Sequence, residues 1–102
     1  MNTDELIAHS RSRFDHAAAK RVLKEKYQGR MTFAHSGGLW RAGPELLTLL
    51  HTVKENKSLV LLDLYENPVQ VIPDELFEIA QQRWQEQMTA WLVEYTEINK
   101  NR

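Results

Sequence analysis

The sequence predicts an α+β fold with its elements in the order αββαββα, in a single domain that spans residues 1–102. A long opening segment without Gly or Pro, two pairs of short β-rich runs, and a strongly periodic closing helix predict this order. At 102 residues the chain can bury roughly two-thirds of its unfolded surface in one core. We therefore expect two β-hairpins to join in a small, mainly antiparallel sheet packed by helices.

The opening segment, TDELIAHSRSRFDHAAAKRVLKEKYQ, predicts one helix because it is rich in Ala, Leu, Lys, Arg and Glu. Thr3 is suited to cap its N-terminus, with acidic residues in the first turn, and Gly29 is the expected stop. The apolar residues expected on its buried face are Leu6, Ile7, Phe14, Ala17, Ala18 and Val22.

A β-hairpin is expected next, with strands at 31–35 and 39–42 and a turn at Ser36-Gly37-Gly38. A shift of thirty residues aligns GPELLTLL with PDELFEIA, and it places the two glycines opposite Asn67-Pro68, at another turn. Positive φ in a hairpin therefore explains these glycines better than a phosphate loop, and the pattern GxxxxGK[ST] is absent.

The middle of the chain predicts a short, largely buried helix that starts at Pro44 and contains LLTLLHTV. A second hairpin follows, with strands in SLVLLDLY and PVQVI and a turn at Glu66-Asn67.

The last helix, from about Asp74 to Asn99, has the strongest periodic signal in the chain. Its apolar residues recur at steps of three and four: Phe77, Ala80, Trp84, Met88, Trp91, Tyr95 and Ile98. Because the helix is longer than the core of a small domain needs, its distal aromatic residues need a partner, which is either the first helix or a second copy of the chain.

Composition excludes several classes of protein. The chain has no cysteine, so a disulfide framework and a thiolate metal site are impossible. No apolar run reaches the ~20 residues that span a bilayer, and MNTDELIAHSRSRF lacks the apolar core of a signal peptide. We therefore expect a cytoplasmic protein without a membrane partner.

Charge is distributed unevenly along the chain. Residues 1–30 contain seven Lys and Arg against four acids, while residues 73–102 contain three against six. A basic first segment can mark a nucleic-acid surface, but the acidic last segment offers it a partner within the same fold or the same oligomer, and we favour the second interpretation.

Candidate catalytic residues are few. His9 and His16 lack metal-site spacing, so we predict neither a metal nor a cofactor. A nucleophilic site at His35, Ser36 and Asp63 is a distant option because the GxSxG pattern is missing. Asp63 reads instead as a hairpin residue whose carboxylate accepts backbone N–H groups. Similarly, strand alternation favours Phe33 and Trp40 as core residues and Arg41 as a solvent-facing residue over a stacking site for nucleic acid.

Three stretches, KEKYQGRMTFAHSGGLWRAGPELLTLL, LLDLYENPVQV and AQQRWQEQMTAWLVEY, resemble small uncharacterised proteins of T4-like tailed phages, particularly marine ones. The resemblance implies a small virus-encoded protein made in the bacterial host cytoplasm. It implies no established activity and no functional residues.

The sequence thus favours a non-enzymatic protein–protein interaction or assembly protein that forms a homodimer through the last helix. The expected contact surface consists of Trp84, Met88, Trp91, Leu92, Tyr95 and Ile98. The alternative is a nucleic-acid-binding accessory protein that uses the basic residues of the first helix: Arg11, Arg13, Lys20, Arg21, Lys24 and Lys26.

Overall fold

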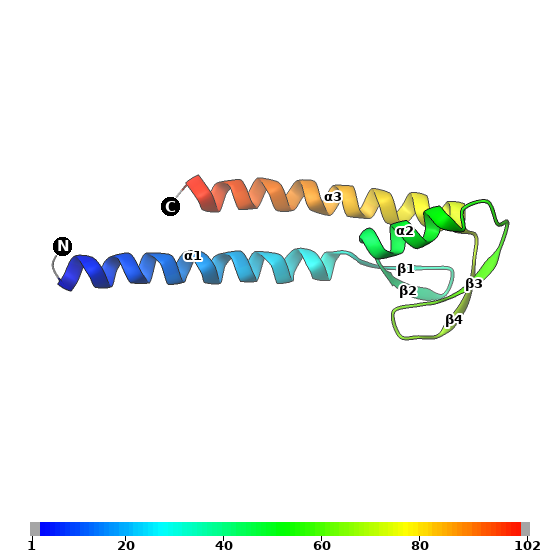
Figure 1. Ribbon diagram of the computed structural model, residues 1–102, viewed down its shortest axis with the longest axis horizontal. Helices are drawn as coiled ribbons and strands as arrows, with labels where there is room; N and C mark the ends of the chain where they lie inside the picture. Colours follow the sequence, from blue (N-terminus) through cyan, green and yellow to red (C-terminus); the bar gives the residue numbers. More distant parts are fainter. Residues whose placement is uncertain (1–2, 101–102) are drawn as a thin grey trace.

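A computed structural model describes residues 3–100, and within this range it describes all side chains except those of residues 5–14. The expected α+β fold and element order are confirmed (Figure 1). The elements are α1 (Thr3–Arg30), β1 (Thr32–His35), β2 (Gly38–Arg41), α2 (Pro44–Thr52), β3 (Leu59–Leu62), β4 (Pro68–Val71) and α3 (Pro73–Lys100).

The molecule is elongated, with principal extents of 67 × 23 × 19 Å. The long helices α1 and α3 run side by side in opposite directions, and the hairpins and α2 gather at one end (Figure 1). Both chain termini lie at the other end, where α1 extends past the last turn of α3. No helix within residues 3–100 is long and apolar enough to cross a membrane.

The first hairpin closes with a two-residue turn, because His35 pairs with Gly38 across it. Ser36 and Gly37 both have positive φ, 55° and 81°, as the tightest hairpin turns require. Positive φ therefore explains Gly37 but not Gly38. A Cβ on Gly38 would lie 3.0 Å from the Val69 side chain and 3.2 Å from Trp40. Gly38 is thus a point of close approach between the two hairpins.

The two hairpins form two separate two-stranded sheets, so the expectation that they join in one sheet was wrong in this detail. They meet at Leu39, whose N–H donates to the Asp63 carboxylate (3.1 Å) and whose carbonyl accepts from the Leu64 N–H (2.8 Å). The outer edge of β2 is therefore occupied at this point by the residues that follow β3, and β3 itself does not pair with β2.

The thirty-residue shift relates β2 and β4, which begin at Gly38 and Pro68. The helices that follow begin at Pro44 and Pro73, so their starts are separated by one residue less than the starts of the two strands. Each helix starts on a proline, whose missing N–H costs nothing in the first turn, and an acidic residue follows it. The two hairpin–helix units therefore share their starting signals.

The core lies at the hairpin end of the molecule. Phe33 and Trp40 are buried there and Arg41 is exposed, as strand alternation predicts. The buried core cluster consists of Met31, Phe33, Trp40, Ala42, Leu50, Val71, Leu76 and Ala80. Residues from both hairpins and from α2 and α3 thus form one core.

Three expectations about the helices need correction. The first helix continues through Gly29 to Arg30 because Gly29 keeps a negative φ. Among its described side chains, the buried ones are Leu23 and Tyr27, whereas Val22 is 62% exposed. Leu6, Ile7 and Phe14 lie outside the described side chains. Helix α2 is less buried than expected, since Leu50 is fully buried while Leu49 of the same helix is exposed.

Candidate interaction surface

Helix α1 covers one side of the distal half of α3. The rings of Tyr27 and Trp91 stack with centroids 6.0 Å apart and an interplanar angle of 9°. Glu94 accepts hydrogen bonds from Lys26 Nζ (2.7 Å) and from the Tyr27 hydroxyl (2.6 Å). These bonds lower the pKa of Glu94, with Lys26 as the largest cause, and the bond to Glu94 raises the pKa of Tyr27. The basic helix therefore meets the acidic helix of its own chain here.

The six residues expected on the contact surface fall into two groups. Trp84, Trp91 and Ile98 are half-buried, Trp84 against the core and Trp91 against Tyr27. The others are more open: Met88 is 39% exposed, Leu92 63% and Tyr95 37%. Packing within the chain thus covers one part of the apolar stripe and leaves another part exposed.

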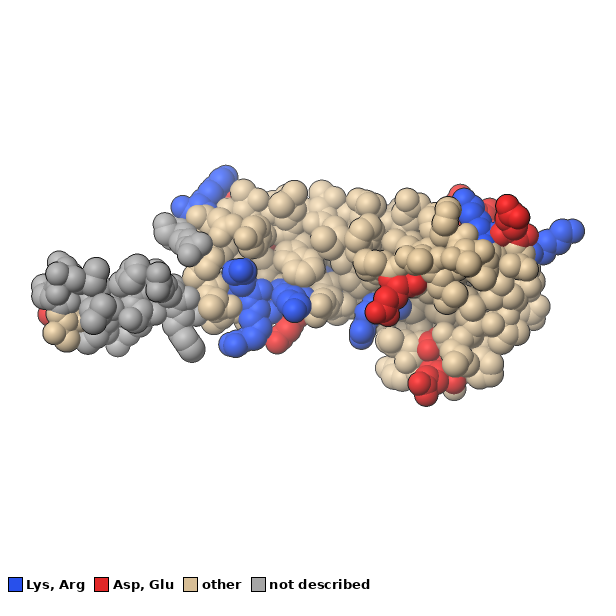
Figure 2. Space-filling view, viewed as in Figure 1, with Lys and Arg blue, Asp and Glu red and all other residues tan. Residues whose placement is uncertain are grey.

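The exposed part belongs to a face of α3 that has no charged residue of its own between Gln81 and Asn99, which we call the neutral face. Its residues recur at helical spacing: Gln81, Trp84, Gln85, Met88, Leu92, Tyr95, Thr96 and Asn99. The charged residues of this stretch lie on other sides of the helix: Arg83, Glu86, Glu94 and Glu97. In Figure 2 the middle of α3 is almost free of charged side chains, whereas Lys and Arg gather over α1 beside it.

The basic residues of α1 do not form one free surface. Lys26 is engaged by Glu94, and Lys20 Nζ lies 6.0 Å from the centre of the Tyr95 ring. Arg21 and Lys24 are exposed, and no hydrogen bond or ion pair joins them to another described residue. The side chains of Arg11 and Arg13 lie outside those that the structure describes.

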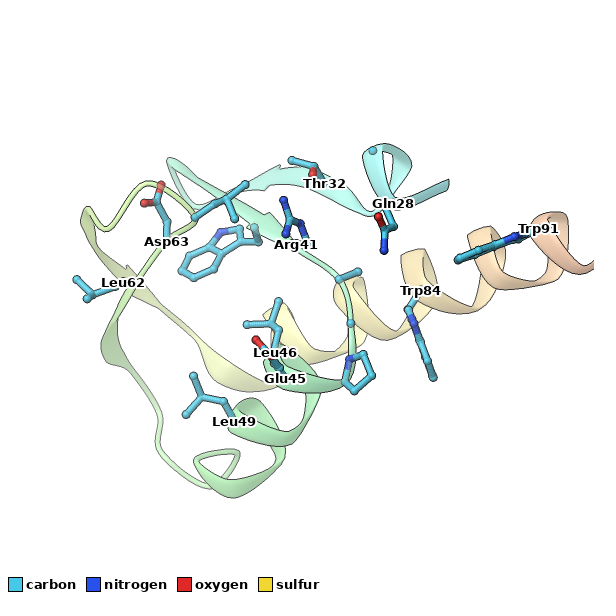
Figure 3. A pocket seen from close by; sticks show the side chains of 16 residues that line it. Gln28, Thr32, Arg41, Glu45, Leu46, Leu49, Leu62, Asp63, Trp84 and Trp91 are labelled. Carbon is cyan, nitrogen blue, oxygen red and sulfur yellow. The ribbon is translucent and has the colours of Figure 1, made fainter. Parts of the chain in front are cut away.

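A groove of about 840 Å³ lies next to the neutral face (Figure 3). Trp84 and Trp91 line the end of the groove that is formed by α3. Its walls are mainly apolar and come from α2, from the end of β3 and from the segment that follows it: Leu46, Leu49, Leu62 and Leu64. Arg41 and Glu45 also line it. Sequence reasoning missed this groove because its walls come from segments that meet only in the fold, although β-strand alternation marks Leu62 as outward-facing.

The structure gives Asp63 the role of a turn residue, as expected. Its carboxylate accepts backbone N–H groups from Leu39 (3.1 Å), Tyr65 (3.0 Å) and Asn67 (2.9 Å). These bonds, that of Asn67 most of all, lower the pKa of Asp63. An acceptor that is already saturated by three donors is a poor general base.

His35 and Ser36 take part in the first hairpin. The carbonyl of His35 accepts a hydrogen bond from Trp40 Nε1 (2.9 Å), and Ser36 occupies the turn. Among the described side chains, no group of three or more His, Asp or Glu residues is placed to hold a metal ion. Comparisons with models of known protein families, with curated proteins and with solved structures find no match, so the functional argument depends on these surfaces.

Proposed function

We propose that the protein is a non-enzymatic protein–protein interaction or assembly protein that forms a homodimer through the neutral face of α3. The observation that supports this is the exposure of Met88, Leu92 and Tyr95 on a face to which α3 contributes no charged residue, next to a side that α1 already covers. We further propose that it works in the cytoplasm, which is the host cytoplasm if the chain is phage-encoded.

The neutral face has the chemistry of a helix-packing surface. Large apolar side chains lie along its centre, and uncharged Gln and Thr residues border them. Each Å² of apolar surface removed from water contributes about 25 cal/mol, so a partner that covers Leu92 and Met88 is favoured over water. Exposed apolar residues that gather on one face, unlike single ones, are typical of contact sites.

A second copy suits this face because a two-fold contact brings the same surface of each chain together. Like charges would then meet if the face carried charges of only one sign, which would cost stability. The neutral face avoids this repulsion, and its apolar residues can pack against their own equivalents.

Nucleic-acid binding is the alternative, and it has less support. It needs free cations on one surface to contact phosphates. Arg21 and Lys24 are free in this sense, but Lys26 is paired with Glu94 and Lys20 lies over Tyr95.

The test is the solution mass by light scattering over a hundredfold range of concentration, at low and moderate salt, with and without DNA. Leu92→Lys should raise the dimer dissociation constant at least tenfold, because it places a charge at the contact. Val93→Lys is the matched control: Val93 is 60% exposed, close to the 63% of Leu92, but it lies outside the neutral face.

Equal masses for the native chain, Leu92→Lys and Val93→Lys would refute the contact. A mass that rises only when DNA is added, and falls again in Lys24→Glu, would support nucleic-acid binding instead.

A further inference from the structure

The groove beside α2 leaves apolar surface in contact with water. Leu49, Leu62 and Leu64 line it and are 45%, 64% and 38% exposed. Trp40 also lines the groove but is almost fully buried in the core, so the accessible apolar surface comes from the leucines. This surface belongs to the hairpin end of the molecule. It shares Trp84 with the neutral face, but Met88, Leu92 and Tyr95 do not line it.

Two free charges of opposite sign accompany this apolar surface. Arg41 and Glu45 both line the groove and are exposed, and no ion pair or hydrogen bond joins either side chain to another described residue. Asp63 is a third charged residue of the lining, but backbone N–H groups of its own chain occupy both of its carboxylate oxygens. The groove therefore offers a partner one free cation and one free carboxylate.

We propose that the groove binds the same groove of a second copy of the chain across a two-fold axis, with Arg41 of each copy paired to Glu45 of the other. In such a contact each residue pair occurs twice, so one unpaired base and one unpaired acid on the same patch are complementary to themselves. A uniformly acidic partner would oppose Glu45, and a uniformly basic one would oppose Arg41.

The shape of the surface fits the same partner. Leu62 projects from the outer face of β3 at the border of the groove, so the patch contains both a protruding residue and a recess. Two copies related by a two-fold axis can each place Leu62 against the recess of the other. The aliphatic stem of Arg41 can cover apolar surface in this contact while its guanidinium reaches Glu45.

This contact goes beyond the proposed function, which uses the neutral face. A chain with two separate self-association faces does not stop at a dimer: each copy contacts one neighbour through α3 and another through the groove. We therefore expect assemblies larger than two chains at high concentration.

The experiment uses the full chain with Leu92→Lys, which disables the neutral face, and measures mass by light scattering over a hundredfold range of concentration. This variant should still form dimers through the groove. Adding Arg41→Glu or Glu45→Arg should raise the dissociation constant of these dimers at least tenfold. The double reversal, Arg41→Glu with Glu45→Arg, should restore association because the two pairs re-form with exchanged signs.

Arg21→Glu is the control, since it reverses an exposed charge on α1 outside the groove. Thermal unfolding of every variant checks that it is folded; Leu62→Gln serves as a second way to disable the groove without reversing a charge. Leu62→Gln should weaken association as Arg41→Glu does.

Three results would overturn the groove contact. They are a Leu92→Lys chain that stays monomeric at every concentration, single charge reversals that do not change the dissociation constant, and a double reversal that does not restore association. The last of these would point to a different protein as the occupant. Leu92→Lys could leave the mass of the native chain unchanged while the single reversals weaken association and the double reversal restores it. This result would refute the neutral-face contact and support the groove contact.

Discussion

The two hairpin–helix units, β1–β2–α2 and β3–β4–α3, have the same order of elements but present different outer surfaces. The first closes with the two-residue turn at Ser36-Gly37, and its exposed outward residues, such as Ala34 and Arg41, are small or charged. The second has a longer turn held by Asp63, and Val60 and Leu62 on its outer face are 62% and 64% exposed. Similar local signals therefore build both units, while the exposed apolar surface concentrates in the second.

This difference means that the residues that stabilise the fold are not the same as the residues proposed to contact a partner. Both units contribute their inner faces to one core, through Trp40 and Leu50 in the first and Val71 and Leu76 in the second. The second unit in addition carries exposed apolar residues on its hairpin and along the neutral face of α3, where part of their surface stays open to a partner. Stabilising residues and contact residues can therefore be changed independently.

Removal of a core leucine from either unit should have the largest effect. Leu50→Ala and Leu76→Ala should each lower the free energy of unfolding by about 2–5 kcal/mol, because both side chains are fully buried and truncation leaves a cavity. Leu49→Ala, the neighbouring control in α2, removes an exposed side chain and should cost much less. Urea unfolding measures all three. If one of the two core substitutions lowered the free energy of unfolding strongly and the other hardly changed it, the two units would not share one core.

Separation of the two hairpins should have an intermediate effect. Gly38→Ala should cost about 1–3 kcal/mol, because the new methyl group would overlap the Val69 and Trp40 side chains. Gly29→Ala is the matched control: nothing lies within 4 Å of its Cβ position, and alanine favours the helix. Unfolding curves should therefore move in opposite directions for the two variants. Equal stability of both would show that the hairpins do not approach closely at Gly38.

The Asp63 turn should have the smallest effect, and it should depend on pH. Because backbone donors lower the pKa of Asp63 from its ordinary 3.8, its carboxylate adds stability above about pH 4. This stability is lost as the pH falls through the lowered pKa. Asp63→Asn should reduce the melting temperature at pH 7 and make the loss of stability below pH 4 less steep. Glu66→Gln, which removes a carboxylate from the same turn, should not reproduce this change.

The sequence predicts the elements well because their signals are local. Pro44 and Pro73 mark two helix starts, Ser36-Gly37 marks the first hairpin turn and Glu66-Asn67 the second. How the two sheets meet depends on the hydrogen bond between Leu39 and Leu64, which are far apart in the chain, and no local pattern encodes it. The buried side of α1 was likewise misjudged, because Tyr27 is buried through its stacking on Trp91, near the other end of the chain.

The two candidate surfaces also differ in how far the sequence predicts them. The periodicity of α3 predicts the residues of the contact stripe, but it cannot tell which of them α1 covers. The groove could not be predicted, since α2 and the end of β3 form it only after folding. Local periodicity therefore finds surfaces on a single helix, and tertiary structure is needed for surfaces shared between elements.

The long antiparallel pair formed by α1 and α3 also determines how the protein diffuses. Its radius of gyration is 19.4 Å, against about 13 Å for a compact chain of this length. By the same scaling, a monomer has the dimensions of a compact chain of about 300 residues. On a gel-filtration column calibrated with globular proteins, the monomer would therefore elute at the position of a dimer or trimer. Elution volume alone would thus report an oligomer where none exists, while scattered light reports the mass regardless of shape.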